Sequence, residues 1–299
     1  MHIFLGTALW GWGVDRKDAL SLLDQFYESG GRFVDAAVNY PINKRAEDFG
    51  LSAKYLSEWI SANPGADLGV LYKIGSVNNL GGPETALGEA DIFLSTELAS
   101  GLFGDALSIV SLHWDNRDDA EDIARTAQAL ARVEREGYQV GLSGVARPDL
   151  YAKAGQLSGS RIWIQVKENA ATNEARLKYQ AAFPDAKYIA YGINMGGVKL
   201  DPPAEGASVA LRGVSEPPVA QTLREIIAKP DGLHPKPATL NHLALMQTWV
   251  NEALSGVILG PRSTAQLKDS LDFIKAIESI GEISRLRKIL YERLTDDRQ

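Results

Sequence analysis

Short apolar runs alternate with amphipathic stretches along the whole chain. Eight of the runs have the length of buried β-strands, and several are apolar at every position, as expected of parallel strands covered by helices. These runs are Ile3–Thr7, Arg32–Ala37, Leu68–Ile74, Leu107–Trp114, Gln139–Val145, Ile162–Glu168, Tyr188–Ile193 and Gly256–Leu259.

The stretches between these runs have the periodicity of helices. Apolar residues recur three or four positions apart in Ala19–Tyr27, Ile123–Leu130 and Leu243–Leu254, which places them on one face of each helix. Gly30 and Gly137 follow the first two stretches and are typical of helix ends. Alternating strands and helices predict an α/β fold.

The number of strand–helix units indicates the architecture. Eight units in 299 residues favour a (β/α)8 TIM barrel that forms a single domain over residues 1–299. A doubly wound sheet is the alternative, but the Gly-x-Gly-x-x-Gly expected after its first strand is absent. Asp201–Pro218 is rich in proline and predicts a long loop. In a barrel this loop would lie at the C-terminal face, as a substrate lid or a surface loop.

Composition narrows the class of protein. The net charge of −7 disfavours nucleic acid and acidic membranes as partners, and no apolar run is long enough to span a bilayer. The absence of cysteine excludes disulfides, thiolate catalysis and cysteine-ligated metals. Residues Met1–Gly6 lack the basic region of a signal peptide, so we expect a cytoplasmic protein that acts on a small molecule.

Proton-handling side chains stand near the ends of three successive predicted strands. Asp35 and Tyr40 come at the end of the second strand, Lys73 ends the third, and His113 lies near the end of the fourth. In a barrel the carboxyl ends of the strands meet at one mouth, so these four side chains are predicted to converge. Each residue alone would more often be structural, but the ordered set favours catalysis.

These four residue types suit proton donation to a carbonyl group. Tyrosine has an ordinary pKa of about 10, which a nearby ammonium such as that of Lys73 lowers. Asp35 would hold Lys73 by an ion pair, and His113 would orient a carbonyl towards Tyr40. The set contains no electron source, so a reduction would require a cofactor.

The same residues resemble the signature of the aldo-keto reductase family. Gly6–Gly11 is similar to the family's opening strand and turn, the spacing from Asp35 to Tyr40 matches, and Lys73 and His113 complete a tetrad. The resemblance covers nearly the whole chain. It implies that Tyr40 is the general acid, that Lys73 lowers its pKa, that Asp35 pairs with Lys73, and that His113 orients the substrate carbonyl.

A second informative segment follows the last predicted strand. Ser263 and Gln266 have the spacing of a capping box, which predicts a helix whose free N–H groups attract an anion. Arg262 adds a guanidinium suited to a phosphate, although an ordinary capped helix beside a surface arginine is the alternative. The segment resembles the family's cofactor motif. This implies that Arg262 and Ser263 hold the adenosine 2′-phosphate of NADPH and that Gly260 and Gln266 belong to the same site.

The resemblance extends to the nicotinamide end of the cofactor. It implies that Ser143 and Gln165 bind the carboxamide and that Tyr191 stacks on the nicotinamide ring. Two departures stand out. Gly144 replaces an asparagine common in the family, and Asp269-Ser270 replaces a Glu-Asn pair after the cofactor motif.

Three functions compete at this point. The leading hypothesis is NADPH-dependent reduction of an aldehyde or ketone, or the reverse alcohol oxidation, with the hydride from nicotinamide and the proton from Tyr40. The alternative is a cofactor-binding barrel protein with a regulatory, non-catalytic role. A metal-dependent hydrolase would use His113 and Asp35 as ligands. Four histidines in all, and no His-x-His or His-Glu-x-x-His motif, disfavour a metal site.

Overall fold

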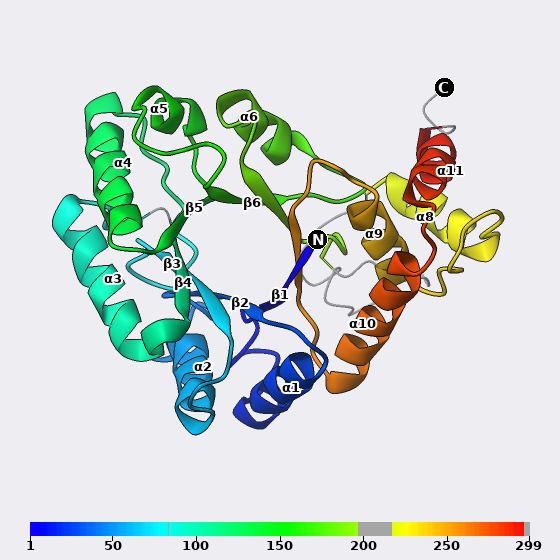
Figure 1. The fold of residues 1–299 in the computed structure, drawn as a ribbon, viewed down its shortest axis with the longest axis horizontal. Helices are drawn as coiled ribbons and strands as arrows, with labels where there is room; N and C mark the ends of the chain where they lie inside the picture. The colour runs from blue at the N-terminus through cyan, green and yellow to red at the C-terminus, as the bar shows by residue number, and fades with distance from the viewer. Residues whose placement is uncertain (83, 197–216, 296–299) are drawn as a thin grey trace.

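A closed barrel of eight parallel strands, paired in sequence order, forms the centre of the molecule (Figure 1). The computed structural model describes residues 1–82, 84–196 and 217–295. The strands are β1 (His2–Gly6), β2 (Phe33–Ala37), β3 (Gly69–Ile74), β4 (Leu107–His113), β5 (Gln139–Ser143), β6 (Trp163–Lys167), β7 (Lys187–Tyr191) and β8 (Gly256–Leu259). The chain is therefore a (β/α)8 TIM barrel, as the sequence predicts.

Helices surround the barrel, and α8 and α11 lie outside α9 and α10 (Figure 1). The described helices are α1 (Arg16–Glu28), α2 (Leu51–Ala62), α3 (Glu89–Phe103), α4 (Ala120–Arg135), α5 (Pro148–Lys153), α6 (Glu174–Ala182), α8 (Val219–Ala228), α9 (Leu240–Trp249), α10 (Thr264–Glu278) and α11 (Ile283–Thr295). Two short 3-10 helices are η1 (Ala46–Asp48) and η2 (Gly104–Ala106). Within the described ranges, no helix is both long and apolar enough to cross a membrane.

Most element boundaries agree with the sequence pattern, but the C-terminal end of α9 does not. The apolar stripe predicted for Leu243–Leu254 continues past α9, which ends at Trp249. Asn251 causes the break, because its side-chain oxygen accepts the N–H of Ala253 (3.1 Å) in a local turn. Of the loop predicted over Asp201–Pro218, residues 201–216 lie outside the described residues, and Pro218 is already the residue before α8.

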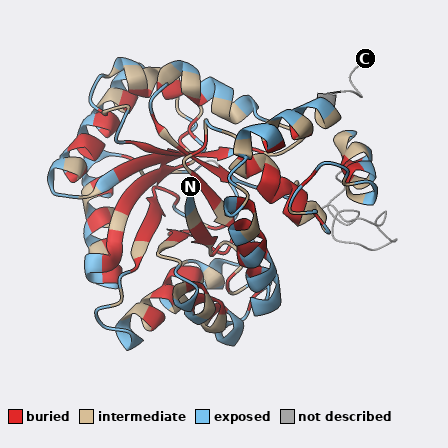
Figure 2. Cartoon of the chain, turned by 45° about the vertical axis from the view of Figure 1, so that its right-hand side comes forward, coloured by how far each residue is buried: buried red, intermediate tan, exposed pale blue. Residues whose placement is uncertain are grey.

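The core has two layers separated by the barrel wall. In Figure 2 most of the barrel strands are coloured as buried, and the exposed residues lie mainly on the helices and loops around them. Large side chains fill the inside of the barrel, namely Phe4, Leu71, Ile109, Trp163 and Ile189. A larger cluster packs the outward-facing strand residues against the helices. Alternate strand residues thus face the two layers, and a polar side chain pointing inward must find a partner inside the barrel.

Candidate active site

The four predicted catalytic residues converge at the carboxyl ends of β2, β3 and β4. Asp35 and Lys73 lie on neighbouring strands, where Ala37 pairs with Lys73 in the parallel register. His113 is the last residue of β4, and Tyr40 follows three residues after β2. The predicted convergence is therefore confirmed as geometry, while the chemical role of each residue stays a prediction.

Lys73 and Asp35 form a buried ion pair inside the barrel. The Lys73 Nζ bonds to Asp35 Oδ1, and the side chains are 1% and 4% exposed. Gln165, on β6 at the other side of the barrel, donates its Nε2 to the same Asp35 oxygen (2.5 Å). Burial lowers the pKa of the Lys73 ammonium, while the charge of Asp35 opposes that shift. The pair is held together because each charge would be costly to bury alone.

Tyr40 lies directly beside this pair. The Lys73 Nζ sits 4.8 Å from the centre of the Tyr40 ring, and the ring meets that of His113 edge to face at 6.0 Å. Burial, followed by the negative charge of Asp35, raises the pKa of the Tyr40 hydroxyl well above its ordinary value of 10.0. The lowering of this pKa by Lys73 stays a prediction, because the direction of the shift reflects burial and the charge of Asp35. Tyr40 stays protonated at neutral pH.

His113 is enclosed and neutral. Burial, and then the positive charge of Lys73, hold the pKa of its imidazole well below the ordinary value of 6.5. Its Nδ1 is buried and has no hydrogen-bond partner among the described residues. An unpaired buried acceptor costs less than an unpaired buried N–H, so we expect the proton on Nε2, the nitrogen left for a substrate.

We expect His113 to make the fold sensitive to acid. Its folded-state pKa is depressed, so as pH falls through about 6.5 the unfolded chain binds the proton first and stability declines. Between pH 7.5 and 5.5 the wild type should lose about 1 kcal/mol more unfolding free energy than His113→Gln. Urea titrations at the two pH values measure this difference. His234→Gln, at an exposed histidine, serves as the control, and equal losses in wild type and His113→Gln would contradict the prediction.

The predicted nicotinamide residues lie on the next strands around the same mouth. Ser143 ends β5 and is buried, and Tyr191 ends β7 with 37% of its surface exposed. The charges of Lys73 and Asp35 both act on the pKa of the Tyr191 hydroxyl, although burial is the main cause of its upward shift. Sequence reasoning did not predict the bond from Gln165 to Asp35, because the two residues are 130 positions apart. That bond uses one N–H of Gln165 Nε2, and the binding of a carboxamide by Gln165 stays a prediction.

The predicted phosphate site lies at the start of α10. Gly260 follows β8 and is exposed, and Ser263 caps the helix by accepting the N–H of Gln266 (3.3 Å). The capping box is only half formed, because the Gln266 side chain accepts the N–H of Arg262 (2.9 Å) rather than that of Ser263. The Arg262 guanidinium lies against the β1–α1 loop, where a Cβ at Gly13 would stand 3.8 Å from its carbon. No residue of the described ranges forms an ion pair with Arg262.

The residues that replace the family's Glu-Asn pair are engaged within the protein. Asp269 accepts a hydrogen bond from Nε2 of His242 (2.9 Å), whose ring stacks on Phe273 at 3.9 Å. Ser270 accepts a hydrogen bond from Asn241 (2.9 Å). Both contacts join α9 to α10. These side chains therefore brace the helix, and in this conformation they do not stand free to bind an adenine.

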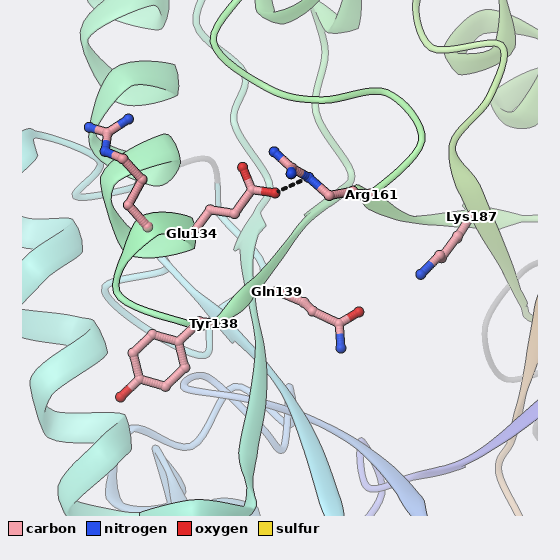
Figure 3. A pocket seen from close by; sticks show the side chains of 6 residues that line it. Glu134, Tyr138, Gln139, Arg161 and Lys187 are labelled. Atoms are coloured by element: carbon pink, nitrogen blue, oxygen red, sulfur yellow. Dashed lines mark ion pairs between the residues drawn. The ribbon is translucent and has the colours of Figure 1, made fainter.

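Other parts of the molecule offer less chemistry. A surface hollow of about 440 Å³ lies at the amino ends of β5, β6 and β7, at the opposite end of the barrel from Tyr40 (Figure 3). Its charged lining includes the ion pair between Arg161 and Glu134 (2.9 Å). Within residues 1–82, 84–196 and 217–295, no three His, Asp or Glu side chains gather in a way that could hold a metal ion.

Two comparisons show which known proteins the chain is similar to. The chain is 33% identical over 76 residues to an "Uncharacterized 11.2 kDa protein in crtE 3'region" of Pseudescherichia vulneris, a match covering 25% of this chain and 74% of that protein. The model of the aldo/keto reductase family matches residues 2–290, nearly the whole chain. The chain therefore belongs to the aldo/keto reductase family of NAD(P)H-dependent oxidoreductases.

Proposed function

We propose that this protein reduces the carbonyl group of a small aldehyde or ketone with NADPH, or oxidises the corresponding alcohol. The observation that carries the proposal is the meeting of Tyr40, the Lys73–Asp35 pair and neutral His113 at one barrel mouth. Bound NADPH would supply the hydride. The residues that would hold it are Ser143, Gln165, Tyr191, Gly260, Arg262, Ser263 and Gln266.

The four residues orient the substrate carbonyl and transfer a proton to its oxygen, each with a separate role. His113 donates its Nε2–H to the carbonyl oxygen and so fixes the carbonyl relative to the Tyr40 hydroxyl. Tyr40 would give its proton to that oxygen as the carbonyl carbon gains a hydride, which would yield the alcohol. The raised pKa of Tyr40 keeps the proton available, and the positive charge of Lys73 stabilises the phenolate that remains. Asp35 holds Lys73 by the ion pair, and Gln165 holds Asp35 by a hydrogen bond.

Binding and turnover can be measured separately. Fluorescence titrations with NADPH and NADH, followed by assays on a panel of aldehydes, ketones and sugars, test the proposal directly. Tight NADPH binding with turnover of at least one carbonyl supports it. Binding without turnover on the whole panel would favour the regulatory alternative, and binding of neither nucleotide would overturn both.

Arg262→Ala is expected to weaken NADPH binding by about 10- to 100-fold, because a hydrogen bond to a charged group contributes about 1.5–3 kcal/mol. NADH lacks the 2′-phosphate, so its binding should change much less. Fluorescence titration of both nucleotides measures the two dissociation constants. Arg135→Ala, at an exposed arginine lining the hollow at the opposite end of the barrel, is the matched control. Equal losses for NADPH and NADH would contradict a 2′-phosphate contact.

A further inference from the structure

Trp114 holds its ring against that of His113 although the two residues are adjacent in sequence. Neighbouring residues on a strand point to opposite faces, so their rings do not normally meet. Here the ring centres lie 4.4 Å apart with an angle of 31° between the planes. The contact arises because the Trp114 backbone has φ +60°, the left-handed region that residues other than glycine seldom adopt. This turn ends β4 and folds the indole back over the imidazole.

The surrounding structure enforces the strained turn. The Trp114 N–H donates to the carbonyl oxygen of Ser143 (2.9 Å), which ties it to the end of β5. The next residue, Asp115, is fully buried and accepts hydrogen bonds from Tyr151 (2.6 Å) and Arg117 (2.8 Å). The hydrogen bonds of the Trp114 N–H and of the Asp115 side chain restrict the backbone conformation of Trp114. Strain that the structure maintains at a site is a reason to look for a function.

Gly144 provides the space that the indole occupies. A Cβ added at Gly144 would stand 2.6 Å from Cδ1 of Trp114, a distance at which one of the two must move. Gly144 itself has φ +67°, which glycine adopts without strain. The glycine and the tryptophan therefore form a matched pair. This gives a physical reason for a glycine at position 144.

The ring of His113 needs such support because no described residue fixes it by a hydrogen bond. A histidine that acts through one nitrogen is usually oriented by a partner on the other, and His113 Nδ1 has none among the described residues. Its ring instead makes an edge-to-face contact with Tyr40 and lies against the ring of Trp114. We propose that Trp114 is a positioning residue that sets the orientation of the His113 imidazole by stacking, with Gly144 giving it room. The inference rests on the proposed function of His113.

Nitrogen NMR of protein labelled with ¹⁵N-histidine tests this directly, because the ring shifts report which nitrogen carries the proton. The chain has four histidines, and the spectrum of His113→Gln identifies the signal of His113. The wild type should show a neutral ring with its proton on Nε2. Trp114→Leu should give averaged shifts and a kcat lower by about 10-fold or more, with an unchanged Kd for NADPH. Trp114→Phe keeps a stacking ring and should restore both.

Two further variants separate positioning from a general loss of structure. Gly144→Ala should move the indole and reproduce the His113 shifts of Trp114→Leu, while the signals of His2 and His242 stay unchanged. Trp249→Leu removes a partly buried tryptophan from α9 and should leave the His113 shifts as in the wild type. Wild-type His113 shifts in Trp114→Leu would overturn the inference even if its rate fell. Altered shifts in a protein that reduces no carbonyl would instead leave the positioning intact and refute the proposed function.

Discussion

Tyr40→Phe should lower kcat for carbonyl reduction by about 10²–10⁴-fold, the range expected when a positioned proton donor is removed. The change deletes one oxygen atom and keeps the ring that packs beside Lys73 and His113. NADPH binding should stay nearly intact, because the predicted cofactor contacts lie on other strands. Steady-state rates on a reducible carbonyl, together with fluorescence titration of NADPH, measure the two effects.

Tyr72→Phe is the matched control for this loss. Tyr72 is a buried tyrosine on β3, adjacent to Lys73 in sequence, but its ring packs outward against Phe103 at 5.1 Å. Removing its hydroxyl should leave kcat close to that of the wild type. A Tyr40→Phe variant with wild-type rates would remove Tyr40 from its proposed role. An equal loss in both variants would mean that the effect is not specific to the mouth.

The second large effect concerns stability. Lys73→Met should lower the free energy of unfolding by about 3–5 kcal/mol, because it leaves the Asp35 carboxylate buried without its ion-pair partner. Methionine has a similar length and is apolar, so lost packing adds little. Urea denaturation followed by circular dichroism measures the difference. Reduction should also fail in this variant, since the phenolate of Tyr40 loses its neighbouring positive charge.

A double variant distinguishes the unpaired charge from other causes of instability. Asp35→Asn combined with Lys73→Met replaces both charges with neutral groups, and an amide at position 35 can still bond to Gln165. We expect the double variant to regain a large part of the stability lost in Lys73→Met, although it stays inactive. A double variant as unstable as Lys73→Met alone would show that the buried carboxylate is not the cause.

The strand pattern predicted the barrel because its information is local. Each run needs only its own apolar residues to be recognised, and β8 begins and ends where the sequence predicts it. Because all eight strands of the barrel run parallel, their carboxyl ends lie on one side. That rule alone brings Asp35, Tyr40, Lys73 and His113 to a common mouth. The sequence therefore predicted which of these residues meet, but not how they are arranged.

Helix ends and caps were less well predicted, because side chains there have several possible hydrogen-bond partners of similar energy. Asn251 turns the chain after α9, although the apolar stripe continues to Leu254. Gln266 bonds to the N–H of Arg262 rather than to that of Ser263. The family resemblance did not predict that Asp269 and Ser270 would brace α9. In each case the spacing in sequence permitted several partners.

The sequence by itself determined the fold, the family and the candidate residues, since periodicity and motif spacing are properties of the chain order. Only the tertiary structure decided how those residues interact. Gln165 reaches Asp35 across the barrel, and Trp114 folds onto His113 because Gly144 leaves room. The pKa of Tyr40 shifts upward because burial and the charge of Asp35 disfavour its phenolate. Contacts between distant segments and the removal of water depend on where atoms lie in space, which no local pattern records.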